Sequence, residues 1–482
     1  MRLVFVNQLS YVVGIFMGIF AVAMTIPALI DFSLGLPQAT AFSHSIIIIT
    51  IAAGFMVTAN RPAGDVQLRN HQAFLLTTLV WSVLCVISAL PFYFSGCTPT
   101  FIDALFEATS GLTTTGATVI RDLSYASPGT YVWRAMLQWF GGIGIIVMAL
   151  TVLPMLRVGG VLLYRNEFSD RSEKFLPRLS HVASHLLGIY TSLTFCCACG
   201  YYFAGMPLLE TVCHSLATVS TGGFSVHNES FRFYQNPVIE SISIVFMILG
   251  GGSLVLQARA FRGDFSVLRD QQIRGYAKVL FFLVCVAAVP SLYQKDSTIG
   301  GGISTLFQLV SMLTTTGYVG TDYESWGGFM KALVWLVMII GGCTGSTSGS
   351  IKIFRYQIIW EHVKGYMRQI IYPRAVVSPK FNGRTIDPAI LMSVITFLAA
   401  FILIILVATL SVTLAGVDLL TALSGALASV TNVGPGFGGV GPSGNYADLP
   451  LYAKVAYSAC MLLGRLEFLT IVILLTPAFW EN

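Results

Sequence analysis

Residues 110–120 read SGLTTTGATVI, and this stretch decides how the rest of the chain is interpreted. Hydroxyl side chains and a glycine follow a short apolar segment, residues 102–113. That segment cannot cross a bilayer, because a spanning helix needs about 20 residues. It can form a helix that enters the membrane and stops halfway. The polar residues after it would then lie at membrane depth, where irregular backbone is tolerated only if it is packed in protein or lines water.

The same arrangement recurs three more times, with short apolar segments at 208–219, 302–314 and 418–430. A polar tetrad with a glycine follows each segment. The four tetrads are Thr114-Thr115-Gly116-Ala117, Ser220-Thr221-Gly222-Gly223, Thr315-Thr316-Gly317-Tyr318 and Asn432-Val433-Gly434-Pro435. The glycines aligned with one another are Gly116, Gly222, Gly317 and Gly434. We therefore predict a unit of helix, short helix, glycine loop and helix, repeated four times in one orientation around a common axis.

The composition predicts an all-α polytopic membrane protein. Of 482 residues, 55% are hydrophobic and 10% are charged, whereas a soluble protein has about 25% charged residues. Soluble, disordered, collagen-like and coiled-coil chains are excluded by the same figures. Ten spanning helices are expected, at 9–30, 43–59, 73–96, 131–156, 183–205, 237–258, 276–293, 327–351, 388–414 and 450–477. The predicted division is an N-terminal pair of helices in 1–60, then units at 72–156, 183–260, 275–352 and 387–478.

The distribution of charge predicts the orientation in the membrane. Of 27 Lys and Arg residues, 20 fall in the N-terminus and in the segments 60–72, 157–182, 259–278 and 352–387. Positive residues are enriched in cytoplasmic loops, so these segments and both termini are expected to be cytoplasmic. The basic segments can contact lipid headgroups, form a docking face for a partner, or do both. The net charge of +5 is modest and does not suggest nucleic acid.

The acids of the opposite, outer side include Asp103 and Glu107 of the first short segment. They are expected to attract cations weakly to the outer mouth.

The chemistry of the four tetrads suits a cation that has lost its water. An inward-facing ring of backbone carbonyls can replace the hydration shell, and glycine tolerates the backbone angles that this requires. Each short helix also points the negative C-terminal end of its dipole toward the centre. The sequence therefore predicts a cation selectivity filter made of the four tetrads.

A second polar stretch interrupts the predicted span 327–351. Its small and polar residues make a continuous helix improbable, and they include Gly341, Gly342, Gly345, Ser346, Thr347, Ser348 and Gly349. The alternative is a small-residue face for helix packing. Arg465 lies near the middle of the last predicted span, where a charge is costly and usually faces a bundle interior or water. It can hold carbonyls of the Gly341–Ser350 stretch. The alternative is a salt bridge, but Glu467 is two positions away on one helix and points to a different face.

Four segments carry a resemblance to a known family. They are SGLTTTGATVI (110–120), LATVSTGGFSVHN (216–228), LTTTGY (313–318) and VTNVGPGFGG (430–439), and they resemble the pore loops of the TrkH/TrkG/KtrB superfamily of potassium-translocating membrane proteins. The helix pair before residue 60 is similar to TrkH and TrkG rather than to KtrB. The resemblance implies K⁺ uptake across the bacterial inner membrane as part of a Trk-type system, with K⁺ as the transported ion and no organic cofactor. It also implies a homodimer and a cytosolic nucleotide-binding ring, TrkA.

The resemblance further implies that the Gly341–Ser350 stretch lies under the filter as a gate, and that Arg465 faces the pore. The four tetrads differ from one another, so the preference for K⁺ over Na⁺ is expected to be imperfect. A secondary transporter that couples K⁺ to proton or sodium movement is the alternative. An intramembrane enzyme with Ser346 or Ser348 as nucleophile is disfavoured, because no GxSxG motif occurs and no histidine is predicted nearby. We therefore expect no enzymatic activity.

Overall fold

The computed structural model describes residues 2–62, 70–151, 175–293, 299–375 and 378–480. Helices dominate this part of the chain. The sheet found in it is a two-stranded antiparallel hairpin of β1 (Lys380–Phe381) and β2 (Arg384–Thr385), in which Lys380 lies opposite Thr385. The predicted all-α architecture is confirmed.

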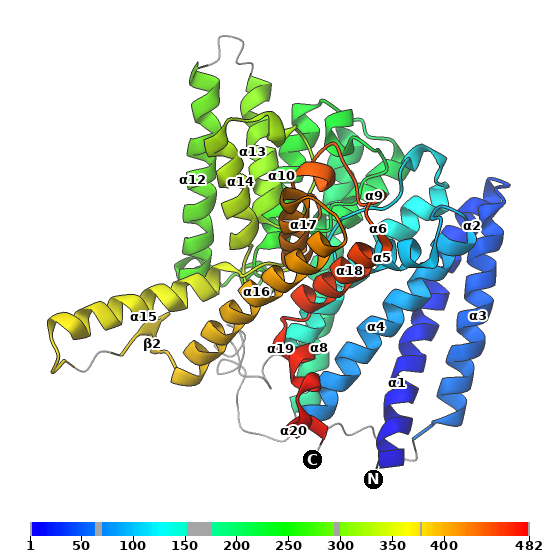
Figure 1. The fold of residues 1–482 in the computed structure, drawn as a ribbon, viewed down its shortest axis with the longest axis horizontal. Coiled ribbons are helices and arrows are strands. Elements are labelled where there is room, and N and C mark those ends of the chain that lie inside the picture. The colour runs from blue at the N-terminus through cyan, green and yellow to red at the C-terminus, as the bar shows by residue number, and fades with distance from the viewer. Residues whose placement is uncertain (1, 63–69, 152–174, 294–298, 376–377, 481–482) are drawn as a thin grey trace.

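The N-terminal helices lie at one side of the molecule (Figure 1). They are α1 (Arg2–Ala23), α2 (Thr25–Ser33) and α3 (Gln38–Ala59). The carboxylate of Asp31 in α2 is fully buried and accepts hydrogen bonds from Ser127 Oγ and from the backbone N–H of Gly129, both at 2.7 Å. Because these donors lie at the start of the next unit's second helix, one side chain ties the N-terminal helices to the first unit.

The same order of elements then occurs four times. The first helices are α4 (Asn70–Phe94), α8 (Phe175–Phe203), α12 (Gln271–Tyr293) and α16 (Pro388–Leu414). The short helices are α5 (Phe101–Leu112), α9 (Leu208–Val219), α13 (Ile299–Leu313) and α17 (Leu419–Thr431). The second helices are α6 (Pro128–Thr151), α10 (Pro237–Gly251), α14 (Gly328–Ile340) and α18 (Leu451–Arg465). The short helices fall where they were predicted. Two of them begin with a side-chain cap, in which Thr100 accepts the N–H of Asp103 and Asp418 accepts the N–H of Thr421.

Each of the ten predicted spans overlaps a helix, but three of them are interrupted. By length and composition five helices in the described residues can cross a membrane, or up to seven if each bent pair is one span. The span predicted at 237–258 bends by 100° between α10 and α11 (Leu254–Phe261), and that at 450–477 bends by 104° between α18 and the segment Leu469–Leu475. The span predicted at 327–351 ends at Ile340, as the polar stretch after it suggested. The end of the span at 131–156 lies outside the described residues.

A glycine at an equivalent position marks where the second helix of a unit approaches the short helix. Each second helix carries a glycine 13 positions after its first residue, and these are Gly141, Gly250, Gly341 and Gly464. A Cβ atom at three of them would collide with a carbonyl oxygen near the end of a short helix, namely that of Leu112, Val219 or Val430. The helices α6, α10 and α18 therefore touch the short helices backbone to backbone where the loops begin, whereas Gly341 follows the end of α14.

A long amphipathic helix follows the third unit. α15 (Ile353–Ile371) projects from the side opposite the N-terminal helices (Figure 1). Its inner end is buried, whereas Trp360 and Ile371 are exposed. The β1–β2 hairpin packs against it through Phe381, whose ring lies 5.1 Å from that of Phe354. The chain ends in the short helices α19 (Leu469–Val472) and α20 (Pro477–Trp480).

Candidate functional site

The four short helices end in the same hydrogen-bonded turn. In the first, the N–H of Thr114 bonds to Gly111 O at 3.0 Å and the N–H of Thr115 bonds to Ser110 O at 2.8 Å. Thr114 itself has a left-handed backbone, with φ of 54°. This pattern is the Schellman motif, which satisfies the last carbonyls of a helix and turns the chain away. The same two bonds close the other three helices, with the left-handed residue at Thr221, Thr315 and Asn432.

The turn fixes the register of the loops and corrects one prediction. Two positions after each left-handed residue stands a glycine with positive φ, and these are Gly116 (83°), Gly223 (81°), Gly317 (77°) and Gly434 (98°). The equivalent glycine of the second loop is therefore Gly223, not Gly222. Gly222 corresponds to Thr115, Thr316 and Val433. The second tetrad was predicted one residue early, because two adjacent glycines look alike until Thr221 is known to end the helix.

The four loops meet in a closed ring. Each of the four glycines lies so close to the next loop that a Cβ atom there would overlap a backbone oxygen of that loop. The approaches run once around: Gly116 to Gly222 O, Gly223 to Thr316 O, Gly317 to Val433 O and Gly434 to Thr115 O. Segments more than 300 residues apart in the sequence are thus neighbours, as the fourfold repeat predicted. Only glycine fits these positions, for reasons of both space and backbone angle.

A ring of hydroxyl side chains lies where the helices end. The residue before each left-handed position is Thr113, Ser220, Thr314 or Thr431, and each donates its hydroxyl to the carbonyl four residues earlier at 2.7–2.8 Å. Thr113, Thr314 and Thr431 were not among the predicted site residues. The signal was present, since this is the one position that carries a hydroxyl in all four loops once their register is known.

The loops line a polar cavity. It has a volume of about 200 Å³, and its walls include Gly116, Gly223, Gly317 and Gly434. Four helix C-termini end beside it, so their dipoles make the centre favourable for a cation. The hydroxyl and carbonyl oxygens at this depth are the hard ligands that an alkali cation takes in place of water.

Buried ion pairs surround the first loop. Arg134 of α6 bonds to Glu107 of α5 through Nε–Oε1 at 2.8 Å, and Lys454 of α18 bonds to Asp103 through Nζ–Oδ1 at 2.6 Å. Glu107 also accepts the N–H of Val119 at 2.9 Å, which holds the chain beyond the first loop. Asp103 and Glu107 were predicted to attract cations at the outer mouth. That prediction is wrong for these two acids, because they are buried and already paired with cations.

An irregular segment lies directly beneath the loops. Residues 341–350 are buried, and Thr347 is one of their contacts with the second unit. Its hydroxyl lies 3.1 Å from that of Thr221 and 3.0 Å from Gly250 O. The N–H of Gly349 donates to Thr315 Oγ1 at 2.8 Å. One segment therefore touches loops of two units, and the predicted break in the helix is confirmed. Of the predicted residues it contains Gly341, Gly342, Gly345, Ser346, Thr347, Ser348 and Gly349.

Arg465 holds this segment in place. Its Nη1 donates to Thr347 O at 2.6 Å, and its Nη2 donates to Gly141 O at 3.1 Å. The predicted contact with a carbonyl of the segment is confirmed. Glu467 does not pair with Arg465 but accepts from Lys352, at 3.0 Å, and from Arg355. These two cations were counted among the basic residues of the cytoplasmic segment 352–387, but both are buried at the start of α15.

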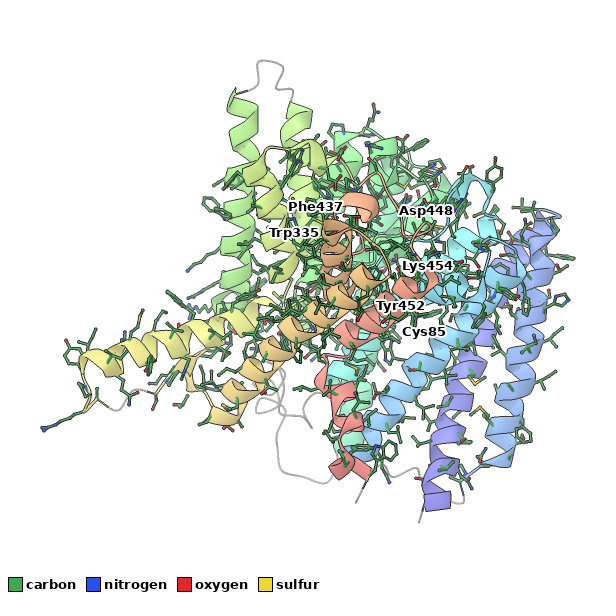
Figure 2. All side chains as sticks on the ribbon, in the orientation of Figure 1. Cys85, Trp335, Phe437, Asp448, Tyr452 and Lys454 are labelled. Atoms are coloured by element: carbon green, nitrogen blue, oxygen red, sulfur yellow. The ribbon has the colours of Figure 1, made fainter. Side chains whose placement is uncertain are left out.

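Aromatic packing supports the fourth loop from outside. Trp335 of α14 stacks on Phe437, with ring centroids 5.1 Å apart and an angle of 9° between the rings (Figure 2). Tyr446 donates its hydroxyl to Gly434 O at 2.7 Å, and Tyr323 donates to Gly436 O at 2.6 Å. The fourth loop is thus braced by aromatic rings, and Glu324 also accepts the N–H of Gly438.

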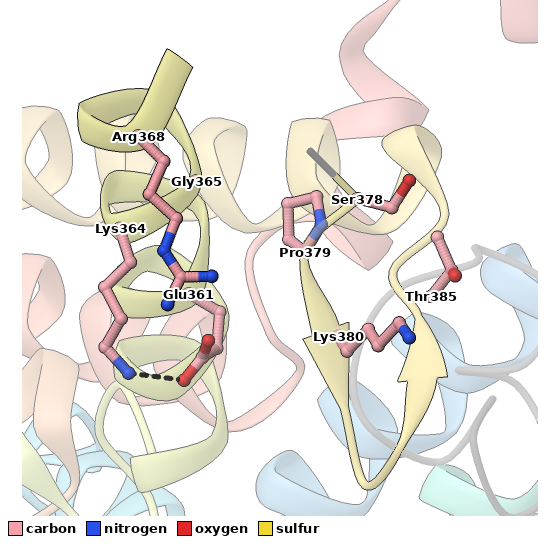
Figure 3. Close-up of a pocket in the computed structure, with 8 residues that line it drawn as sticks. All are labelled: Glu361, Lys364, Gly365, Arg368, Ser378, Pro379, Lys380 and Thr385. Carbon is pink, nitrogen blue, oxygen red and sulfur yellow. Dashed lines mark hydrogen bonds and ion pairs between the residues drawn. The ribbon is translucent and has the colours of Figure 1, made fainter. Parts of the chain in front are cut away.

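A separate basic cavity lies between α15 and the hairpin, far from the loops along the chain. It has a volume of about 720 Å³ and is lined by Lys364, Arg368 and Lys380 together with Glu361 (Figure 3). Lys364 and Glu361 form an ion pair of 2.8 Å. The cavity belongs to the segment predicted to be a cytoplasmic basic face.

The fold and the ring of loops define a multi-pass helical membrane protein in which four like units surround one polar site. A family model described as "Cation transport protein", that of TrkH, matches residues 38–287 and 279–481. The chain belongs to the TrkH family.

Relatives are similar over nearly their full length. The Trk system potassium uptake protein TrkI of Halomonas elongata is 38% identical, covering 96% of this chain and 95% of the relative. The Trk system potassium uptake protein TrkH of Escherichia coli K12 is 34% identical over 99% of both chains. The crystal structure of the potassium transporter TrkH from Vibrio parahaemolyticus superposes with a TM-score of 0.90 at 31% identity, covering 98% of this chain and 99% of the other. The relatives' names describe parts of a system, which implies further components.

Proposed function

We propose that this chain is the membrane subunit of a Trk-type potassium uptake system, and that it carries K⁺ through a gated passage. The closure of the four loops into one ring carries the proposal. The ring offers carbonyl and hydroxyl oxygens at the ends of four helix dipoles, and the relatives' names are those of potassium uptake proteins. The units are 72–156, 183–260, 275–352 and 387–478, with 1–60 added before them.

In this proposal the four predicted tetrads form the selectivity filter, with the second read as Thr221 to Phe224. The segment 341–350 and Arg465 form the gate. Two observations support the gate: the segment is buried directly under the loops, and Arg465 links it to α6 and α18. The unlike tetrads support a preference for K⁺ over Na⁺ that is real but imperfect.

The proposed location, orientation and partners rest on membership of the same family. We place the protein in the bacterial inner membrane with both termini cytoplasmic, as a homodimer that binds a cytosolic, TrkA-like nucleotide-binding ring. The excess of basic residues on one side supports this orientation. The basic cavity of α15 supports a docking face on that side.

The alternatives are less well supported. Proton coupling would use a midplane acid, and Glu467 of the last predicted span is a candidate for that role. Its carboxylate is already paired with two cations, Lys352 and Arg355. For an enzyme, Ser346 would need a base, but its hydroxyl donates to Cys343 O and lies 2.6 Å from Ser348 Oγ.

Flux in liposomes tests the proposal. The purified chain should carry K⁺ down its own electrochemical gradient, with no dependence on an imposed proton or sodium gradient. Gly116→Ser should lower the K⁺/Na⁺ permeability ratio about tenfold, because a side chain there meets the second loop; tenfold corresponds to about 1.4 kcal/mol of lost discrimination. Gly96→Ser is the matched control, since Gly96 also has positive φ, at 72°, but open space around it. A ratio that is equal in both variants would contradict the filter assignment.

A further inference from the structure

The four second helices differ at one buried position. Three residues before the shared glycine, the later units carry Met247, Met338 and Met461, all fully buried. The first unit carries Gln138 instead, and this side chain is also fully buried. A buried amide must find partners for its donor and its acceptor, whereas a thioether need not.

The second loop also differs from the other three at the residue after the left-handed turn. Thr115, Thr316 and Val433 have side chains there, whereas Gly222 has none. The two exceptions touch one another. A Cβ atom at Gly222 would overlap the side chain of Gln138, including its Cδ atom. The glutamine of the first unit therefore fills the space that a side chain of the second loop would otherwise occupy.

Both ends of the amide bind the backbone of that loop. Nε2 of Gln138 donates to Gly222 O at 2.6 Å, and Oε1 accepts the N–H of Phe224 at 3.1 Å. One turn earlier on α6, Arg134 donates to Ser225 O at 2.7 Å, and its guanidinium lies 4.0 Å from the centre of the Phe224 ring. Helix α6 thus contacts the next unit's loop at Gly222, Phe224 and Ser225.

The first and third loops are braced from within their own unit. In the first, Glu107 of the short helix accepts the N–H of Val119. In the third, Gln308 of the short helix donates to Tyr318 O at 3.3 Å and accepts the N–H of Gly320 at 3.0 Å. Both residues stand seven positions before the left-handed residue.

In the second loop that position holds His214. Its Nε2 contacts the Ser225 hydroxyl at 3.1 Å rather than a backbone group. The second loop therefore lacks the brace of the first and third, and Gln138 supplies one from the neighbouring unit.

We propose that Gln138 is a positioning residue of the selectivity filter that completes the second loop and thereby sets its contribution to K⁺ selectivity. The inference rests on the proposed function. By fixing Gly222 O and the N–H of Phe224, the amide holds the orientation of the peptide groups that flank Gly223. Without it, these groups are free to turn, and the ring loses the spacing that favours the larger cation.

The test is a double-mutant cycle read as the K⁺/Na⁺ permeability ratio in liposomes. Gln138→Met, which installs the residue of the other three units, should lower the ratio about fivefold, as expected for losing hydrogen bonds to the loop. Gly222→Thr alone should lower it as well, because the new side chain overlaps the glutamine. The combined Gln138→Met/Gly222→Thr chain copies the residues of the next unit, Met247 of α10 and Thr316 of the third loop, and should return to within about twofold of the starting ratio. Met247→Leu, at the equivalent buried position, is the matched control and should keep the ratio.

Each outcome decides the inference. An unchanged ratio in Gln138→Met, or a combined variant no better than the worse single one, overturns it. If Gln138→Met does not fold, Gln138→Glu keeps the shape but loses the Nε2 donor, and an unchanged ratio there also overturns it. A starting chain that shows no preference for K⁺ would instead overturn the proposed function.

Discussion

Gly223 and Gly263 share a left-handed backbone but have different surroundings. Their φ angles are 81° and 84°, yet a Cβ atom at Gly223 would overlap Thr316 O, whereas nothing lies within 4 Å of one at Gly263. An alanine costs about 1–2 kcal/mol at either position through its backbone alone. Only at Gly223 does it also displace a neighbouring loop. At the scale of a residue, the ring is therefore controlled by crowding between loops as well as by backbone freedom.

This difference leads to a prediction about ion binding. A ligand that binds the folded state raises its melting temperature. K⁺ should therefore stabilise the unaltered chain and the Gly263→Ala variant equally, and should no longer stabilise Gly223→Ala. Melting curves of the three purified proteins with K⁺ and with choline would check this. A K⁺-dependent rise that persists in Gly223→Ala would argue that the second loop does not contact the ion.

The second loop also shows what a single sequence can specify at this scale. The presence of a glycine loop after each short helix follows from composition and spacing. The choice between Gly222 and Gly223 does not, because both are glycine and the deciding fact is the left-handed turn at Thr221. In the other three loops no second glycine adjoins Gly116, Gly317 or Gly434, and each of these has the positive φ expected of the aligned glycine.

At the scale of an element, the Arg465 side chain ties the segment 341–350 to the fourth unit. The shorter hydrogen bond of Arg465 goes to Thr347 O, and this bond joins the fourth unit to the third. The segment is otherwise held mainly by its own turns and by bonds to α10 and to the loops. Removing the guanidinium should therefore allow the segment to move away from the loops. Sequence composition predicted the break in this helix from its run of glycines and hydroxyls. It did not predict the bend after Arg465, where no proline or glycine follows and the turn is made by Glu467 and Phe468, both with positive φ.

Arg465→Ala should therefore raise basal K⁺ flux about tenfold in liposomes that contain no regulatory partner. The estimate corresponds to the loss of a hydrogen bond from a charged donor, about 1.5–3 kcal/mol, reduced by partial replacement with water. Arg121→Ala is the control, since Arg121 pairs with Asp448 on the surface and 75% of its side chain is exposed. If both variants conduct like the unaltered chain, Arg465 does not restrain the passage.

At the scale of the whole molecule, the buried carboxylate of Asp31 forms a polar link between the N-terminal helices and the first unit. Asp31→Ala leaves the N–H of Gly129 without its acceptor in a buried place. We expect a loss of about 1–3 kcal/mol in stability, measured as a lower melting temperature in detergent. Asp448→Ala, at a surface ion pair with an exposed carboxylate, should change stability by less than about 0.5 kcal/mol. Equal melting temperatures would show that Asp31 does not carry the link.

The sequence predicted the arrangement of the units better than the structure of the segment that follows the third unit. Four units and an N-terminal pair follow from hydropathy and from the repeated loops, because these are long-range patterns that each residue supports weakly but consistently. The arm formed by α15 and the hairpin was read only as a basic cytoplasmic stretch. Its buried and exposed faces depend on packing between Phe354 and Phe381, which no local pattern in 352–387 indicates.

The pairing of Glu467 with Lys352 and Arg355 has a consequence for biosynthesis. More than 110 residues separate the cations from their carboxylate along the chain, so both emerge from the ribosome long before it. Until Glu467 has been made, two positive groups must wait at the edge of the bilayer or remain solvated. Compaction of the third unit against the fourth is thus delayed until this carboxylate is available, which makes its synthesis a late checkpoint in the assembly of the two units.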